Sequence, residues 1–208
     1  MSEIKKIATH RKIGVLVHFT RTENLEGILT HGLLPRTAFD RNGLNPLLTD
    51  QMRLDSCLDA SSLSIGFPNY KMFYACRMNT PGAKWAVIVY RPSILWEKRC
   101  AFCTENAAKA SVAAIRIDDR MTPQAFEALF SEVEGKPTRN ALRLDAGSPT
   151  NPQAEVLVFE AIEPSYIIGI GFDEQPLVDE YKTRFPLVAM RRHSGLFGPR
   201  VDYIHWKK

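Results

Sequence analysis

The sequence lacks any long hydrophobic run. None of its apolar stretches approaches the roughly 18–20 consecutive apolar residues that a membrane-spanning helix needs, and the N-terminal residues MSEIKKIATHRK carry charge without an apolar segment behind them. We therefore expect no membrane span, no secretory signal peptide and a cytoplasmic location. The chain has 208 residues, of which 45% are hydrophobic, so it is long enough to form one domain with a sizeable core.

Cysteine is also scarce, with thiols at Cys57, Cys76, Cys100 and Cys103. An intracellular domain of this size needs no disulfide bonds, so we expect all four thiols to be reduced. Cys100 and Cys103 have half the spacing of a zinc site, but no second CxxC or HxxxH pair supplies the other two ligands. The sequence therefore predicts no metal site.

The common nucleotide-binding and hydrolase motifs are absent. Gly169 and Gly171 lack the third glycine of a dinucleotide fingerprint, and no GxxxxGK[ST] phosphate loop is present. Ser64 precedes Gly66 but lacks the GxSxG context of a nucleophile elbow. These absences argue against Rossmann dehydrogenases, kinases, P-loop enzymes and serine hydrolases.

Charge of both signs is present, but it is unevenly distributed. The net charge is +4, from 27 Lys and Arg against 23 Asp and Glu. Residues 1–12 carry four basic residues against one acidic, and residues 182–208 carry seven against one, which leaves a net −5 for the middle. A polyanionic partner is therefore expected to lie along the basic ends.

Apolar periodicity and turn residues predict the elements of a mixed fold. We expect strands over 13–19, 71–76, 85–90, 154–161 and 166–171. We expect helices from an N-cap at Thr22 to a C-cap at Gly32, near 104–110, after Thr122-Pro123 and over 174–184. Long loops are expected over 35–70 and 134–153. Strands without regular helix alternation indicate a single α+β domain over residues 1–208, with a twisted, mainly antiparallel sheet flanked by short helices.

The first candidate site is at the end of the strand over 13–19. His18 and Thr20 are two residues apart and so project to the same side of a strand, where both can reach one ligand. The helix that follows presents its amino end beside them, which suits a sugar phosphate. The alternative from spacing alone is a buried core histidine and a turn threonine.

Three further features could belong to the same site. Arg53, in the loop over 35–70, could clamp a pyrophosphate with two parallel hydrogen bonds, although most loop arginines are only solvated. Residues 64–74 interleave aromatic and polar side chains that could line a pocket for a flat ring, with Tyr70 and Met72 among them, or could pack in the core. Glu155 opens an apolar strand, where a carboxylate is either catalytic at a pocket edge or exposed on an edge strand.

These segments together resemble the DarT family of bacterial toxins, which transfer ADP-ribose from NAD to bases in single-stranded DNA. The resemblance rests on the ordered segments HFT at 18–20, NL at 24–25, IL at 28–29, HGLL at 31–34, Arg53, FPNYKMFY at 67–74 and QAEVLV at 153–158. It covers roughly residues 13–172 and implies an ADP-ribosyltransferase-like fold. Residues 59–74 look closer to the branch that modifies guanine than to the thymine-modifying branch.

The resemblance implies a role for each matching residue. Glu155 matches the catalytic glutamate and Arg53 an arginine essential for activity, while residues 139–153 match the substrate-recognition loop. The NAD-binding residues that it implies, together with the two from the flat-ring segment, are His18, Phe19, Thr20, Asn24, Gly27, Gly32, Leu33, Tyr70 and Met72. It also implies NAD as co-substrate without a metal, and a macrodomain antitoxin that removes ADP-ribose from DNA.

The acceptor is expected to be single-stranded, because atoms on base edges are out of reach inside a duplex unless the base is extruded. A basic groove with aromatic platforms would bind such a strand. The residues expected to form it are Arg191, Arg192, His193, Arg200 and Trp206 near the C-terminus, with Phe67 and Tyr70 by the pocket. Two alternatives are the same chemistry on RNA and a catalytically inactive module that binds single-stranded nucleic acid.

Overall fold

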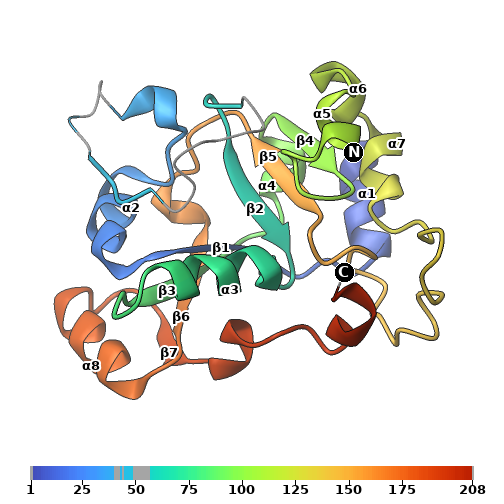
Figure 1. The fold of residues 1–208 in the computed structure, drawn as a ribbon. Helices are drawn as coiled ribbons and strands as arrows, with labels where there is room; N and C mark the ends of the chain where they lie inside the picture. The colour runs from blue at the N-terminus through green and yellow to red at the C-terminus, as the bar shows by residue number, and fades with distance from the viewer. Residues whose placement is uncertain (1, 40–42, 44, 49–56, 208) are drawn as a thin grey trace.

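The computed structural model describes residues 2–39, 43, 45–48 and 57–207, and a central sheet organises them (Figure 1). Within these residues the sheet has seven strands in the order β4-β5-β2-β1-β3-β6-β7. Their bounds are β1 Leu16–Arg21, β2 Ser61–Ile65, β3 Trp85–Tyr90, β4 Cys100–Cys103, β5 Glu155–Val158, β6 Ile167–Phe172 and β7 Met190–Arg192. Each neighbouring pair is antiparallel except β6 and β7. The prediction of one α+β domain with a mainly antiparallel sheet is confirmed.

Short helices surround the sheet, as predicted. They are α1 Glu3–His10, α2 Leu25–His31, α3 Tyr70–Asn79, α4 Ile94–Glu97, α5 Ala110–Ala113, α6 Ile117–Arg120, α7 Pro123–Ala128 and α8 Gln175–Arg184. Helices α1 and α4–α7 gather around the β4–β5 end, α8 lies by β6 and β7, and α3 crosses in front of the sheet (Figure 1). No helix in the described residues is both long and apolar enough to cross a membrane.

Local signals explain most of these elements. Thr122 caps α7 by accepting a hydrogen bond from the Ala125 backbone N–H at 3.1 Å, and Pro123 occupies the first turn, where its missing N–H costs nothing. Gly32 ends α2 with φ of 87°, as predicted from its position. Thr22 is not the N-cap that we expected: it begins a 3-10 turn, Thr22–Asn24, and its hydroxyl donates to Glu23.

The prediction of a strand over 71–76 is wrong, because these residues belong to helix α3. Asn69 caps this helix by accepting a hydrogen bond from the Met72 backbone N–H at 3.2 Å. The run Lys-Met-Phe-Tyr-Ala-Cys contains no β-branched residue, so aromatic content alone suggested a strand. Strand β2, by contrast, lies in a serine-rich part of the predicted loop, where polar residues hid a strand that is paired on both sides.

The sheet splits into two halves between β1 and β2, which pair over only a short stretch. Within the described residues, β1 pairs with β2 at Leu16–Ile65 and Val17–Ser64, whereas six residues of β1 pair with β3. Beyond Val17 the strands diverge, and β2 continues in register with β5 instead. Residues 18–20 of β1, which follow this point, border the space between the two halves.

Cys100 and Cys103 lie on β4 and face opposite sides of the sheet, since Cys100 belongs to the main core and Cys103 to a second apolar cluster. They cannot jointly chelate one ion in this arrangement. No group of three or more His, Cys, Asp or Glu side chains suited to a metal occurs in the part of the chain that the structure describes.

Burial raises the pKa of Cys100 to about 12 and that of Cys103 to about 11, from an ordinary value of 9.0. In the unfolded chain both thiols ionise near pH 9, so the folded state binds more protons above that pH and loses stability as pH rises. We expect the free energy of unfolding to fall by about 2–3 kcal/mol more between pH 8 and pH 10 than in a Cys100→Ala, Cys103→Ala double variant. Urea unfolding at the two pH values measures this, and equal losses would contradict it.

Candidate active site

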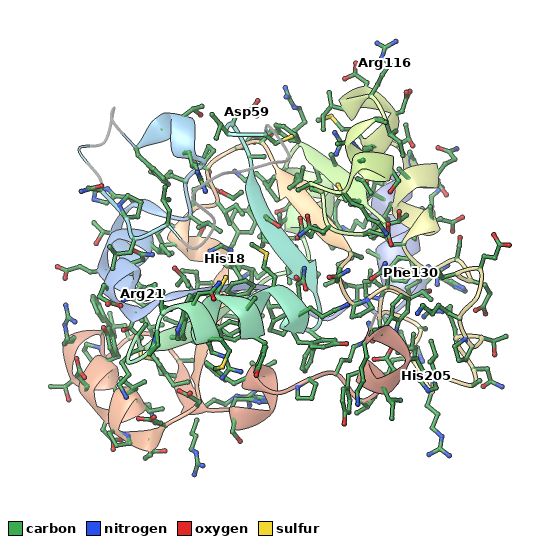
Figure 2. The ribbon with its side chains drawn as sticks, viewed as in Figure 1. His18, Arg21, Asp59, Arg116, Phe130 and His205 are labelled. Carbon is green, nitrogen blue, oxygen red and sulfur yellow. The ribbon has the colours of Figure 1, made fainter. Side chains whose placement is uncertain are left out.

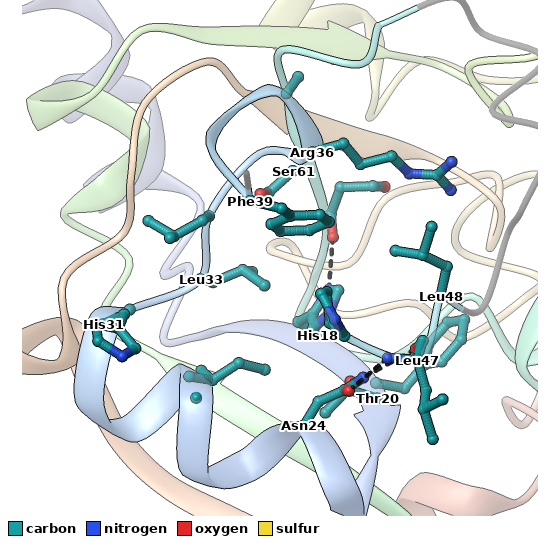
Figure 3. A pocket seen from close by; sticks show the side chains of 18 of the residues that line it. His18, Thr20, Asn24, His31, Leu33, Arg36, Phe39, Leu47, Leu48 and Ser61 are labelled. Carbon is teal, nitrogen blue, oxygen red and sulfur yellow. Dashed lines mark hydrogen bonds between the residues drawn. The ribbon is translucent and has the colours of Figure 1, made fainter. Parts of the chain in front are cut away.

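A cavity of about 650 Å³ opens where β1 and β2 diverge. Helix α2 forms one wall, residues 45–48 another, and β2 with the start of α3 closes the remaining side. Figure 2 places His18 near the middle of the molecule, and Figure 3 shows it inside the cavity with Phe39 and Leu48 nearby. The residues predicted from the sequence that line the cavity are His18, Phe19, Thr20, Asn24, Gly27, Gly32, Leu33, Met72 and Glu155. Its volume lies within the roughly 300–1,000 Å³ typical of ligand and cofactor sites.

The His18 and Thr20 side chains share one side of β1, as strand alternation requires. His18 Nδ1 lies 2.9 Å from the Ser62 carbonyl oxygen of β2, so Nδ1 is the donor of this hydrogen bond. This hydrogen bond spans the gap where the β1–β2 ladder stops. Phe19 borders the cavity, but its ring stacks on Phe73 with centroids 4.5 Å apart, so it anchors α3 to the sheet.

Glu155 is the buried acidic group of the cavity, with 6% of its surface exposed. Its Oε1 accepts hydrogen bonds from Asn106 Nδ2 at 3.2 Å and Asn69 Nδ2 at 3.5 Å. Its Oε2 accepts one from the Ala107 backbone N–H at 3.2 Å. The carboxylate is therefore fixed in one orientation, and the interpretation of Glu155 as a solvent-exposed edge residue is wrong.

Sequence reasoning missed the two asparagines that hold this carboxylate. Asn69 is 86 residues from Glu155 along the chain and Asn106 is 49 residues away, so no local pattern links them. The only signal was that Asn69 immediately precedes a run that proved helical. Arg36 was also missed, although it lines the cavity and adds a cation to a wall that contains Glu23 and Glu26.

Asn24 lines the cavity, and its side-chain amide is hydrogen-bonded to Thr20 and Leu47. Its Nδ2 donates to Thr20 Oγ1 and to the Leu47 carbonyl, both at 3.0 Å, and its Oδ1 accepts from the Leu47 N–H at 2.8 Å (Figure 3). Asn24 thus binds the backbone of Leu47 as a neighbouring strand would. It holds residues 45–48 against the cavity.

One predicted site residue, Tyr70, lies outside the cavity lining that the described residues form. Burial together with Asp202 raises the pKa of the Tyr70 phenol, while Arg200 opposes this. Arg53 lies outside the described residues, and its role stays a prediction.

The expected nucleic-acid platform at the C-terminus is only partly present. Arg200 and Trp206 are 8% and 6% exposed, so neither can bind a strand from solvent. Arg191 and Arg192 of β7 are exposed, and together with His193 they line a shallow hollow. Phe67 packs against the apolar cluster around Phe73.

Solved structures of DarT proteins have a similar fold. A structure described as Thermus sp. 2.9 DarT in complex with ADP-ribosylated ssDNA has a TM-score of 0.62 and 17% identity, and the match covers 90% of this chain and 97% of that one. The same protein in complex with NAD⁺ gives 0.58 and 16%, covering 90% and 98%. The chain belongs to the DarT family, because the family model described as "ssDNA thymidine ADP-ribosyltransferase, DarT" matches residues 17–197.

A third similar structure is described as Thermosipho africanus DarTG in complex with ADP-ribose, with a TM-score of 0.62 and 16% identity. The match covers 88% of this chain but 51% of that one, so this chain spans about half its length. No curated protein matches the sequence closely enough to count as a relative.

Proposed function

We propose that this protein is an NAD-dependent transferase that attaches ADP-ribose to a base, guanine in our assignment, in single-stranded DNA. The observation that carries this proposal is the buried Glu155 carboxylate, fixed by three N–H donors beside a cavity that also presents His18 and Thr20. The DarT structures solved with NAD⁺ and with ADP-ribosylated ssDNA have the same fold.

In the proposed reaction, the bond between the ribose C1 and the nicotinamide nitrogen breaks, and a bond from C1 to a base nitrogen forms. Nicotinamide leaves, and the base loses a proton. Positive charge develops on the ribose carbon, and a buried carboxylate stabilises it more in the transition state than in the ground state. Glu155 meets this requirement, since N–H donors of the described residues Asn69, Asn106 and Ala107 already fix its position before the substrate arrives.

Other residues of the cavity wall would bind the sugar and the phosphates of NAD. Thr20 and His18 line the cavity from one face of β1, and a hydroxyl and an imidazole suit the hydroxyl groups of a nucleotide sugar. Arg36, and Arg53 by resemblance, would provide the positive potential that two phosphates need against Glu23 and Glu26. A lysine at either arginine position would lack the two parallel donors of a guanidinium.

The choice of guanine rests on residues 59–74, which resemble the guanine-modifying branch of the family more than the thymine-modifying branch. These residues fold as β2, a turn at Gly66 and the start of α3. Ser64, Asn69 and Met72 from it line the cavity, so it is placed to contact the acceptor base or the cofactor. Thymine, the base in the description of the family model, is the competing acceptor.

Matched oligonucleotides decide the acceptor. Single-stranded DNA with one guanine, one thymine or neither is incubated with protein and NAD labelled in the adenosine, alongside the same sequences as RNA and as duplex DNA. We expect label on single-stranded DNA that contains guanine. Label that requires thymine would overturn the base assignment, and label on RNA alone would overturn the DNA assignment.

In a cell, we propose a toxin located in the cytoplasm, with a macrodomain antitoxin as its partner. A protein that modifies DNA bases would block replication and would need an enzyme that removes the modification. The DarTG structure, of whose chain the match covers 51%, is described as a complex with ADP-ribose. Coexpression with such a macrodomain should restore growth that the chain alone prevents.

Asn24 provides a direct test of the cavity wall formed by residues 45–48. Asn24→Ala removes the two hydrogen bonds to Leu47, each worth about 1 kcal/mol, so we expect KM for NAD to rise roughly 10- to 30-fold with a smaller change in kcat. Steady-state kinetics measure this. Asn79→Ala, at the exposed end of α3, is the matched control and should behave as wild type. An unchanged KM in Asn24→Ala would show that this segment does not contribute to binding NAD.

A further inference from the structure

The last residues of the chain fold back into the protein and form a buried cluster, which we name the C-terminal latch: Arg200, Asp202 and Trp206. Arg200 Nε and Nη2 donate to the two carboxylate oxygens of Asp202, both at 2.6 Å. Trp206 Nε1 donates to Asp202 Oδ2 at 2.8 Å. All three residues are less than 9% exposed, so the Arg200–Asp202 pair is a buried ion pair and not a surface one.

The latch contacts the 134–153 loop at both of its ends. Arg200 Nη1 donates to the Pro149 carbonyl at 2.7 Å, and Nη2 donates to the Thr150 carbonyl at 2.8 Å. At the start of the loop, Lys136 Nζ donates to the His205 carbonyl at 2.8 Å, and its charge lies 5.1 Å from the centre of the Trp206 ring. Figure 1 shows the C-terminal segment beside this loop, and Figure 2 labels His205 there.

The latch also contacts helix α3. Lys71 Nζ, in the first turn of α3, donates to the Trp206 carbonyl at 2.7 Å. Two residues earlier, Asn69 caps the helix and donates to Glu155. The latch is therefore one contact away from a group that fixes the catalytic carboxylate.

The loop leads to Glu155 from the other direction. Thr150 and Asn151 are 1% and 3% exposed and lie four to five residues before Glu155. Arg139 braces the loop internally by donating to the Ser148 carbonyl at 2.7 Å and to Thr150 Oγ1 at 2.8 Å. The latch thus holds together the two segments that flank Glu155.

The cavity, in contrast, contains no residue of the latch or of the loop among its lining residues. The latch also lies beyond residue 197, where the family match ends. We propose that the C-terminal latch is a positioning device that fixes the 134–153 loop and α3 relative to Glu155, so that the acceptor strand, and not NAD, is correctly placed. This inference rests on the proposed transferase function.

Two variants weaken the contacts of the latch while they keep a cation at position 200 and leave Asp202 and Trp206 in place. Arg200→Lys keeps a cation but cannot make all four hydrogen bonds. Lys71→Met leaves the Arg200–Asp202 pair intact and removes only the contact with α3. The matched controls are Arg116→Lys, at an arginine whose side chain is 81% exposed, and Lys84→Met, at a lysine whose side chain is 51% exposed.

Transfer kinetics separate the two substrates. We expect both latch variants to lower kcat/KM for the oligonucleotide by tenfold or more while KM for NAD stays within twofold of wild type, and both controls to match wild type. Wild-type behaviour of Arg200→Lys and Lys71→Met would overturn the proposal. An equal rise in both KM values would also overturn it, since it would indicate a general structural role.

Hydrogen exchange tests the same proposal without activity. In Arg200→Lys we expect faster exchange of the loop amides over 139–150, with the amides of β1 and α2 unchanged. Unchanged exchange in the loop would contradict the latch. If wild-type protein transfers nothing, the proposed function fails, and this measurement still decides whether the latch holds the loop.

Discussion

Glu155→Gln is expected to lower the rate of ADP-ribose transfer at least 100- to 1,000-fold, the range seen when one preorganised electrostatic group is removed from an active site. The glutamine has the same size but no charge to stabilise the developing cation. It also cannot satisfy its neighbours, because Asn69 and Asn106 donate to one oxygen and the Ala107 N–H donates to the other. One donor must then face an amide NH₂, which costs about 1–3 kcal/mol.

The asparagines cannot rotate to relieve this conflict without losing other contacts. Asn69 Oδ1 accepts from the Met72 N–H, and Asn106 Oδ1 accepts from the Ala108 N–H at 2.9 Å. The matched control is Glu127→Gln, on the exposed side of α7, which should keep wild-type turnover and stability. Turnover of Glu155→Gln within tenfold of wild type would remove Glu155 from the reaction.

Gly32→Ala is expected to lower the free energy of unfolding by about 3 kcal/mol and to weaken NAD binding. Gly32 has φ of 87° and ψ of 175°, a backbone region that is almost exclusive to glycine and costs other residues about 1–3 kcal/mol. An added Cβ would lie in close contact with the backbone oxygen of Ile162. Relief requires α2 to move from the Leu33–Ile162 bridge, and α2 forms one wall of the cavity.

Gly27→Ala is the matched control for this glycine. Gly27 is in the same helix and lines the same cavity, but a Cβ there meets nothing within 4 Å. Alanine at this helical position should stabilise the protein by about 0.5–1 kcal/mol. Urea unfolding of both variants measures the difference. Equal stability of the two variants would contradict the account of Gly32.

Local rules predicted the parts of the site that depend on neighbours in the sequence. Strand alternation predicted that His18 and Thr20 lie on one side of β1. The preference for glycine at helix C-caps predicted that α2 ends at Gly32. The site could be outlined because these residues lie within 15 positions of one another. The strand pattern left Glu155 as either catalytic or exposed, and the resemblance favoured the catalytic interpretation; the structure places Glu155 in the same cavity.

Features that depend on distant partners could not be predicted. Residues 71–76 have a strand-like composition, but they fold within helix α3, which Asn69 caps. Arg200 and Trp206 carried the signals of a nucleic-acid surface, yet Asp202 and the carbonyls of residues 149–150 bury them. Burial of a charged group needs a paired partner, and Arg200 finds two of its acceptors about 50 residues away.

The basic residues near the C-terminus therefore do not all form one surface for nucleic acid. Part of the basic C-terminal segment is internal and holds the loop before Glu155, while Arg191 and Arg192 remain on the surface. If these two exposed arginines bind phosphates, DNA affinity should fall as salt rises.

We propose that this chain transfers ADP-ribose from NAD to a base in single-stranded DNA. Mass spectrometry of an oligonucleotide after incubation with NAD and the wild-type protein tests it most directly. We expect an oligonucleotide that carries one ADP-ribose on a base, with one nicotinamide released for each, and no product with Glu155→Gln. An unmodified oligonucleotide, with NAD either intact or merely hydrolysed, would contradict it.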